Sequence, residues 1–315
     1  MQKHFEKFCK SNLVNKKIAI TGSKGFIANH VKQKLKYFGI NKSKLVCLNS
    51  TNTNYFQLNN LKKKLKGVDY VIHLSSATGG IKYTKEKSSE QFYITMLKDL
   101  NIFEASKQCN VKKVITLGNL HAYPGDINGM LKEKDLHKGL PVESHIGIGW
   151  SKRNLDVLRK VYSKNNSKTK FLILYSANCY GPGDTLDLNH GHIIPKLIIQ
   201  CLKNKDFQIF GSTNAVREFI YVKDLTNIII LSLLKLNNSC SLNIGSGESI
   251  KISHLIKKII KKTAFEKKIK NQSFIIDNSK RYCGKVNLEK FLNYKILYKL
   301  EEGLKETIDW YKKFV

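Results

Sequence analysis

A glycine-rich turn near the N-terminus limits the fold more than any other feature of the chain. The apolar run at residues 17–21 has the character of a short strand, and residues 29–38 follow helical spacing. Between them, Gly22 permits a tight turn and Gly25 lets the backbone approach a pyrophosphate, which the N–H groups of the next helix face. This context predicts dinucleotide binding, with contacts from Gly22, Ser23, Lys24, Gly25, Phe26 and Ile27.

Strands and helices continue to alternate after this turn. Helical patterns occupy residues 91–109 and 149–162. The apolar runs of strand type lie at residues 44–48, 68–77, 111–117 and 171–174. This alternation predicts an α/β fold with a doubly wound parallel sheet of the Rossmann type.

The length of the chain leaves room for a second, smaller part. A chain of 315 residues can hold such a sheet and a C-terminal substrate-binding lobe. A loop that contains Pro182 and Gly183 follows the run at 171–174 and marks a change of pattern. We expect a cofactor-binding domain over residues 1–175 and a lobe formed mainly by residues 176–315, with the chain crossing back to the sheet.

Further short motifs follow one another along nearly the whole chain. They are Ala77-Thr78-Gly79-Gly80-Ile81, Val111-Lys112-Lys113-Val114, Leu117-Gly118 with Tyr123-Pro124, Tyr180-Gly181-Pro182-Gly183-Asp184, His192-Ile193-Ile194-Pro195, Arg217-Glu218-Phe219-Ile220-Tyr221-Val222, Asn243-Ile244-Gly245-Ser246-Gly247 and Leu300-Glu301-Glu302-Gly303-Leu304. In their order and spacing the chain resembles the extended short-chain dehydrogenases of the NAD-dependent epimerase/dehydratase family, and within it the GDP-L-fucose synthase group. The resemblance implies a nucleotide-sugar substrate and a homodimer built on helices 91–109 and 149–162.

The positions that carry chemistry in this family are altered. The family's Tyr-x-x-x-Lys helix keeps its lysine as Lys152, but Ile148 stands in place of the tyrosine, and a carbon side chain cannot carry a proton. The resemblance assigns Lys152 to the cofactor ribose. It places Asn119 where the family has a serine that hydrogen-bonds the reacting oxygen, and His121 where it has an acid–base cysteine.

Two histidines remain that can move protons beside a sugar 4-ketone. His192 matches the family's His-x-x-Pro element, and imidazole, with an ordinary pKa of about 6.5, can give or take a proton near neutral pH. His121 can equally be a hydrogen-bonded residue at a strand end. His145, just before the helix, could substitute for the missing hydroxyl, and an ordinary solvent-facing loop histidine is the alternative. The candidate catalytic residues are Lys152, His192, His121 and Asn119.

The choice of cofactor depends on the residues after the second strand. An acidic side chain there normally binds the ribose hydroxyls of NAD. Here the strand is followed by Asn49, Ser50 and Thr51, and Lys24 lies in the glycine loop. Without a carboxylate to repel a 2′-phosphate, NADP is favoured, with NAD as the alternative. The resemblance adds Leu74, Ser75, Ser76 and Ala177 to the cofactor contacts.

A nucleotide sugar brings a diphosphate, which arginine recognises by bidentate hydrogen bonds. The resemblance places Arg217 on this diphosphate, although a salt bridge with the adjacent Glu218 is the alternative. Segment 279–282 is similar to a family loop that closes over the nucleotide, and a GDP-linked sugar is preferred. The further positions assigned to the substrate are Gly80, Asn178, His192 and Lys280.

Composition narrows the possible partners and the compartment. The net charge of +31 comes from lysines scattered over the chain, so we expect a solvated basic surface and no nucleic-acid partner. Seven cysteines without a Cys-x-x-Cys pair indicate neither a disulfide framework nor a metal site. The polar N-terminal segment and the absence of a long apolar run predict a cytoplasmic protein without a membrane partner.

These observations leave two readings of the function. The first is an NAD(P)-dependent enzyme that epimerises or reduces a nucleotide-linked 4-keto sugar during the synthesis of surface-glycan sugars. The second, motivated by Asn119 and Ile148, is a catalytically weakened relative that binds cofactor and nucleotide sugar as a partner or regulator. Salt-sensitive binding to DNA or RNA would be needed to support a third, nucleic-acid-binding function.

Overall fold

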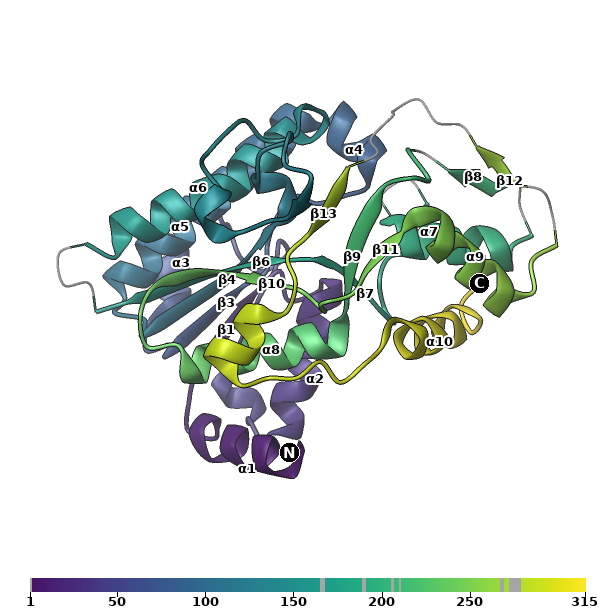
Figure 1. Ribbon diagram of the computed structural model, residues 1–315. Helices are drawn as coiled ribbons and strands as arrows, with labels where there is room; N and C mark the ends of the chain where they lie inside the picture. Colours follow the sequence, from purple (N-terminus) through teal and green to yellow (C-terminus); the bar gives the residue numbers. More distant parts are fainter. Residues whose placement is uncertain are drawn as a thin grey trace.

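The computed structural model describes residues 2–164, 168–188, 191–204, 207–209, 211–266, 269–271 and 279–315. Within these residues, the larger part of the molecule is a six-stranded sheet with helices on both faces (Figure 1). Its strands, in spatial order, are β10 (Cys240–Ile244), β6 (Lys170–Ser176), β4 (Lys113–Asn119), β3 (Tyr70–His73), β1 (Ile18–Thr21) and β2 (Leu45–Leu48). Every pairing is parallel, so the predicted doubly wound α/β fold is confirmed.

Helices cover both faces of this sheet. Figure 1 shows α3 (Leu58–Leu65), α5 (Ser88–Gln108) and α6 (Ile146–Tyr162) on one face. On the other face lie α1 (Gln2–Leu13), α2 (Phe26–Tyr37) and α8 (Val222–Lys235). Because both faces are covered, the strands are continuous apolar runs, as in β1, where every residue is buried.

The order of the strands fixes where a ligand can bind. The chain passes from β1 to β2 on one side and then returns to β3 on the other side of β1. In open α/β sheets, ligands bind at such a reversal, outside the carboxyl ends of the strands. The glycine turn and the segments that follow β2 and β3 all lie at this edge.

A smaller lobe packs beside the sheet. Its helices are α7 (Ile193–Leu202), α9 (Ile252–Thr263) and α10 (Leu300–Tyr311), whereas the short helix α4 (Ile81–Glu86) contacts α5. Its strands are β5 (Gly129–Met130), β7 (Asn178–Tyr180), β9 (Val216–Tyr221), β11 (Ser249–Lys251) and β13 (Lys280–Tyr282), with β8 (Phe207–Ile209) and β12 (Ile269–Asn271) as a separate pair. Short helical turns are η1 (Lys42–Lys44), η2 (Leu120–Ala122), η3 (Glu133–Asp135), η4 (Glu143–His145) and η5 (Leu288–Leu292).

Two hydrophobic clusters follow this division in space. One surrounds the six-stranded sheet and includes residues from α8 and β10, such as Ile229 and Ile244. The other joins α7, α9 and α10 through residues such as Leu197, Ile256 and Ile308. The chain therefore returns from the smaller lobe to the sheet between residues 222 and 244.

Three predicted helices begin three residues earlier than their patterns indicate. The patterns start at residues 29, 91 and 149, whereas α2, α5 and α6 begin at Phe26, Ser88 and Ile146. The predicted start of α6 is too late because glycine normally weakens a helical pattern and the first turn of this helix contains Gly147 and Gly149. A Cβ atom on Gly149 would lie 2.8 Å from the carbonyl oxygen of His121, so this glycine allows α6 to pack against η2.

Candidate active site

The glycine loop crosses the ends of three strands in a conformation that only glycine supports well. Gly22 has φ of +63°, and a Cβ atom there would lie 2.8 Å from the carbonyl oxygen of Leu74. The N–H of Ser23 donates to Leu48 O at 3.0 Å, and that of Gly25 donates to Gly22 O at 2.8 Å. No side chain caps α2, which leaves the first N–H groups of this helix, at Phe26 and its neighbours, available to a pyrophosphate.

The residues after β2 form a polar group beside this loop. The ammonium of Lys24 donates to Thr51 Oγ1 at 3.3 Å, and Asn49 Oδ1 accepts a hydrogen bond from the backbone N–H of Thr51 at 3.0 Å. Asn49 also donates from Nδ2 to Ser23 Oγ at 3.4 Å, while Ser50 is exposed. A lysine with hydroxyl and amide groups suits a phosphate on the ribose better than it suits bare ribose hydroxyls.

The segment after β3 is held against β1 and α5. Thr21 Oγ1 accepts the N–H groups of Leu74 and Ser75 at 3.0 and 3.2 Å. Ser76 Oγ lies 3.3 Å from the hydroxyl of Thr95 on α5. Leu74, Ser75 and Ser76 are therefore held at the switch point of the sheet, where Leu74 and Ser75 border Gly22.

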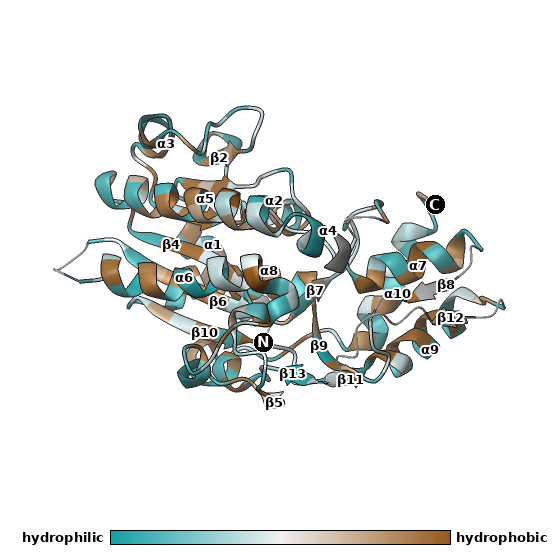
Figure 2. Ribbon diagram, turned by 90° about the horizontal axis from the view of Figure 1, so that it is seen from above, coloured by the Kyte–Doolittle hydropathy of each residue, from teal (hydrophilic) through white to brown (hydrophobic). Residues whose placement is uncertain are grey.

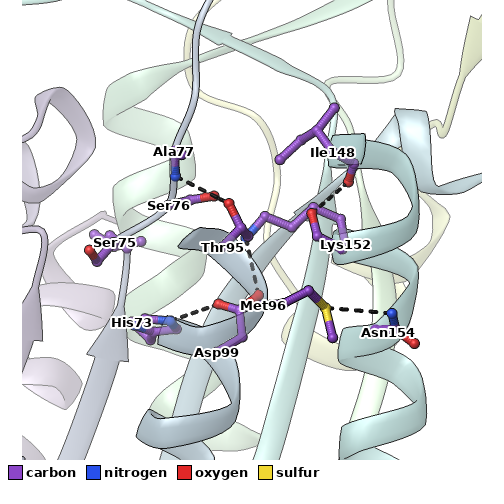
Figure 3. Close-up of polar contacts among 12 residues, drawn as sticks. His73, Ser75, Ser76, Ala77, Thr95, Met96, Asp99, Ile148, Lys152 and Asn154 are labelled. Carbon is purple, nitrogen blue, oxygen red and sulfur yellow. Dashed lines mark hydrogen bonds and ion pairs between the residues drawn. The ribbon is translucent and has the colours of Figure 1, made fainter. Parts of the chain in front are cut away.

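Lys152 extends from α6 towards α5. No side chain with a hydroxyl lies one turn before it on the helix, where the residue is Ile148. The side chain of Lys152 is buried and points towards Thr95 and Asp99 on α5, with Nζ 3.7 Å from Asp99 Oδ2 (Figure 3). Ile148 is 3% exposed and presents only carbon. The structure thus keeps the lysine of the family's motif in place without its proton-carrying partner.

His121 and His145 come from separate turns and stack against each other. Asn119 Oδ1 accepts the backbone N–H of His121 at 3.1 Å, which fixes the start of η2. The two imidazole rings are parallel within 4°, with centroids 3.9 Å apart. Burial lowers the pKa of His121 well below its ordinary value, and the charges of His145, Arg281 and other nearby cations lower it further.

His192 lies at the N-terminal end of α7, on the smaller lobe. Its side chain is about half exposed, and Nδ1 lies 3.5 Å from Oδ2 of the buried Asp184. The charge of His192 is also among the causes that lower the pKa of His121, after burial. A Cβ atom on Gly80 would lie 2.5 Å from Gly191 O, so the predicted substrate position Gly80 is next to the segment that carries His192.

The remaining predicted substrate and cofactor positions lie on strand ends. Asn178 is exposed and donates from Nδ2 to Glu218 O at 3.1 Å, and the buried Ala177 donates its N–H to Ile244 O at 2.8 Å. Arg217 donates from Nη1 to Ser279 O at 2.6 Å.

Glu218 has a structural role of its own. Its carboxylate is buried and accepts the backbone N–H groups of Gly247, Cys283 and Gly284 at 2.6 to 3.0 Å. These three donors satisfy its charge from the backbone of two other segments. The carboxylate thus ties β9 to the loops after β10 and β13.

The segment predicted to be a loop over the nucleotide is different in the structure. Residues 280–282 form strand β13, which pairs with β9 and β5, and residues 272–278 lie outside the described chain. Lys280 remains exposed on this strand. The segment is held in this strand by Arg281, which is buried and donates to Pro124 O and Leu120 O at 2.7 and 2.8 Å. This arginine anchors the segment beneath the turn that carries His121.

Asp99 is the buried group near the site that the sequence analysis missed. It lies in the middle of α5 and has no exposed surface. One signal could have revealed it: Gln91, Thr95 and Asp99 recur every four residues and are all buried, so they form a polar stripe on one helix face.

Two kinds of feature are absent from the described residues. None of the described helices combines the length and apolar character needed to cross a membrane. No group of three or more histidine, cysteine, aspartate or glutamate side chains in this part of the chain could hold a metal ion.

Comparisons with known proteins agree with this geometry. The GDP-L-fucose synthase of Dictyostelium discoideum is 23% identical over 303 residues, which cover 93% of this chain and 94% of that protein. The GDP-L-colitose synthase of Yersinia pseudotuberculosis is 24% identical over 272 residues, or 84% of this chain and 86% of the relative. A GDP-mannoheptose C4 reductase from Campylobacter jejuni, solved with NADP bound, superposes with a TM-score of 0.84 at 21% identity and covers 95% of this chain and 99% of its own.

A family profile matches more than half of the chain. The profile described as the NAD dependent epimerase/dehydratase family matches residues 18–245, from the first strand of the sheet to the end of its last strand. This span includes the glycine loop, Lys152, His121 and His192. The chain belongs to the NAD-dependent epimerase/dehydratase family.

Proposed function

We propose that the protein is an NAD(P)-dependent enzyme that modifies a nucleotide-diphosphate sugar, by epimerising a 4-keto sugar, reducing it at C4, or both. The observation that carries this proposal is the packing of η2, which carries the His121–His145 stack, against α6, the helix of the buried Lys152, in a chain with an intact glycine loop. The relatives named above act on GDP-linked sugars, which supports the same nucleotide here. A role in the synthesis of surface-glycan sugars follows from that substrate class.

The residues present fit a dinucleotide cofactor. The cradle at Gly22 would be filled by a Cβ atom, and the uncapped N-terminus of α2 offers N–H groups to a pyrophosphate. Lys24 and Thr51 would hold a 2′-phosphate, so we propose NADP, with NAD as the alternative. The bound cofactor supplies the hydride, and Lys152 binds its ribose. The other residues proposed to contact it are Ser23, Gly25, Phe26, Ile27, Asn49, Ser50, Leu74, Ser75, Ser76 and Ala177.

Histidines carry the protons in this proposal. Removing a proton beside a ketone needs an unprotonated acceptor, and His121, whose pKa is lowered by burial and by neighbouring cations, is neutral near pH 7. His192, held near Asp184, serves as the second proton-transfer group. Asn119 has Oδ1 occupied by the N–H of His121, which leaves its amide nitrogen to donate to the sugar's carbonyl oxygen.

The nucleotide-sugar half would bind along the smaller lobe. Arg217 lies on β9 beside Ser279 and would bind the diphosphate, because its planar guanidinium matches two phosphate oxygens. The other proposed substrate contacts are Gly80, which approaches the segment before His192, together with Asn178 and Lys280. Residues 1–175 would thus serve the cofactor and residues 176–315 mainly the substrate.

A homodimer would form through α5 and α6, as the resemblance implies. These helices pack along each other, and bands of hydrophobic residues occur on both (Figure 2). Tyr93 on α5 and Val157 and Val161 on α6 are 62%, 43% and 58% exposed. We place the protein in the cytoplasm, where nucleotide sugars are made available to such enzymes.

One observation favours a second candidate function. Ile148 is buried where the family's proton donor belongs, and a protein without that donor could bind cofactor and nucleotide sugar as a partner or regulator. This candidate requires binding without turnover.

Calorimetric titration separates these possibilities before any turnover is assayed. NADPH and NADH would be titrated first, followed by GDP-, UDP-, dTDP- and CDP-linked sugars into the cofactor complex. The proposed enzyme binds NADPH and one nucleotide-sugar class. Binding of both without conversion of any 4-keto sugar would support the partner or regulator instead, and failure to bind any nucleotide sugar would contradict both.

A further inference from the structure

A series of polar contacts runs from Thr21, at the end of β1, to Lys152 on α6. Thr21 Oγ1 lies 2.6 Å from His73 Nδ1, and His73 Nε2 lies 2.8 Å from Asp99 Oδ1. Asp99 Oδ2 in turn lies 3.7 Å from Lys152 Nζ (Figure 3). These contacts connect Thr21, next to the glycine loop, with Lys152, and all four side chains are almost entirely buried.

The hydrogen bonds fix the direction of this series of contacts. Thr21 Oγ1 already accepts two backbone N–H groups, from Leu74 and Ser75, so its own proton must go to His73 Nδ1. His73 is therefore the neutral tautomer with its proton on Nε2, which donates to Asp99. Burial lowers the pKa of His73, in agreement with a neutral ring. Asp99 is left as the anionic acceptor at the end of the series.

The free oxygen of Asp99 faces the lysine. Among the described residues, Asp99 Oδ2 accepts no hydrogen bond, although the side chain has no exposed surface. Burying a carboxylate and an ammonium costs desolvation free energy that their attraction often does not recover, so a buried ion pair is a poor way to stabilise a fold. Its position beside Lys152 therefore points to a role in the site.

We propose that Asp99 is a positioning residue that holds the ammonium of Lys152 over the ribose of the nicotinamide half of the cofactor. The inference rests on the proposed function. In this protein Ile148 offers Lys152 no hydroxyl partner. Asp99 on α5, which is oriented by His73 and Thr21, provides a fixed anionic contact instead. Lys152 then needs no second side chain on its own helix to keep its orientation.

Two ligands test this inference by binding alone. NADPH contacts the whole site, whereas adenosine 2′,5′-bisphosphate fills only the adenine half. Asp99→Asn should weaken NADPH binding about tenfold, the loss of one charge-assisted contact, and leave the affinity for the bisphosphate unchanged. Simple charge repulsion would give the opposite sign for NADPH, because removing a carboxylate would then strengthen the binding of an anion.

A double-mutant cycle shows whether Asp99 acts through Lys152. In a Lys152→Met background, Asp99→Asn should cause no further loss of NADPH affinity. Asp156→Asn is the matched control, since Asp156 is a buried carboxylate on α6 paired with Lys160 at 2.8 Å. That variant should lower the melting temperature and leave NADPH binding unchanged.

Stability gives a second measurement should Asp99→Asn alone fold poorly. Lys152→Met leaves the carboxylate of Asp99 buried without its cation, so the double variant Asp99→Asn/Lys152→Met should melt at a higher temperature than Lys152→Met. Equal weakening of NADPH and bisphosphate, or an undiminished effect of Asp99→Asn in the Lys152→Met background, would overturn the inference. If the unaltered protein bound no NADPH, the proposed function would fall first and this inference with it.

Discussion

The imidazole rings of His121 and His145 lie face to face, with their centroids 3.9 Å apart. Two positively charged imidazoles at this distance repel each other, so the charge of His145 is one of the causes, after burial, that lower the pKa of His121. Ser144 Oγ lies 2.9 Å from Nδ1 of His145 and orients that ring. We propose that this stack exchanges protons with the substrate, because the family's tyrosine and cysteine are both absent here.

Replacing His145 should raise the pKa of His121. The substitution His145→Phe keeps a flat ring for stacking and removes the positive charge, which is one of the causes of the lowered pKa after burial. An NMR titration of the His121 ring should therefore show protonation at higher pH than in the unaltered protein, although still below the ordinary value of 6.5 because burial remains. An unchanged titration would mean that the two rings do not interact electrostatically.

Folding stability should decline in mild acid because of three histidines. The pKa values of His30, His73 and His121 are all lowered, in each case first by burial. The unfolded chain regains the ordinary value of 6.5 and binds protons first, so stability is full above that pH and is lost as the pH falls below it. Urea unfolding between about pH 8 and about pH 5 measures this. A free energy of unfolding that stays flat across this range would contradict the assignment.

Restoring a hydroxyl at position 148 should restore reductive chemistry. Ile148→Tyr places a phenol four residues before Lys152, at an expected packing cost of about 1–3 kcal/mol. Ile148→Phe is the matched control, since it adds nearly the same volume without the hydroxyl. NADPH oxidation with a GDP-linked 4-keto sugar should be faster in the tyrosine variant than in the phenylalanine variant. Equal rates would show that the missing hydroxyl does not limit reduction.

His192 should be required for proton exchange next to the ketone. His192→Ala should slow deuterium incorporation at the adjacent carbons by about 100-fold or more, the usual contribution of a general acid or base. His137→Ala is the control, because His137 is also a partly exposed histidine paired with a carboxylate, Asp156, at 2.9 Å. Unchanged exchange in His192→Ala would exclude the proposed role.

Lys24 should determine the preference for NADP over NAD. Lys24→Ala removes the ammonium beside Thr51 and should weaken NADPH binding about tenfold, the value of a hydrogen bond to a charged group, with little effect on NADH. Lys36→Ala, at an exposed position near the other end of α2, controls for the loss of general positive charge. Parallel losses for both cofactors would show that Lys24 does not contact a 2′-phosphate.

The proposed dimer can be tested on α6. Val157→Lys puts a charge into the proposed interface and should convert a dimer of 36.1 kDa chains into monomers, as measured by light scattering. Leu140→Lys controls for surface charge at an exposed apolar residue outside α5 and α6. A monomeric mass for the unaltered protein would rule out the dimer.

Local signals were sufficient to predict the fold. The turn at Gly22 has a positive φ, and the apolar runs before and after it are the strands β1 and β2. Such features depend on a few neighbouring residues, so they can be recognised from sequence. The predicted start of α6 was wrong because of a tertiary contact: Gly149 is needed for the close approach of η2 to the helix.

The site was less predictable because its contacts join distant segments. His121 in η2 and His145 in η4 are separated by the strand β5 and the helical turn η3, and nothing in their spacing indicates that the rings stack. Segment 279–282 is a strand because Arg281 finds carbonyl partners more than 150 residues away. Asp99 could have been found from its four-residue spacing to Thr95, although its pairing with Lys152 depends on how α5 and α6 pack.

The central claim is that this protein acts on a nucleotide-linked 4-keto sugar although Ile148 replaces the family's proton donor. The most direct measurement is NMR of GDP-4-keto-6-deoxymannose in heavy water with the purified protein, in the presence and absence of NADPH. The account predicts deuterium at the carbons beside the ketone, dependent on His192, with NADPH oxidation as a separate, slower step. Neither deuterium incorporation nor NADPH oxidation, in a protein shown to bind both ligands, would contradict it.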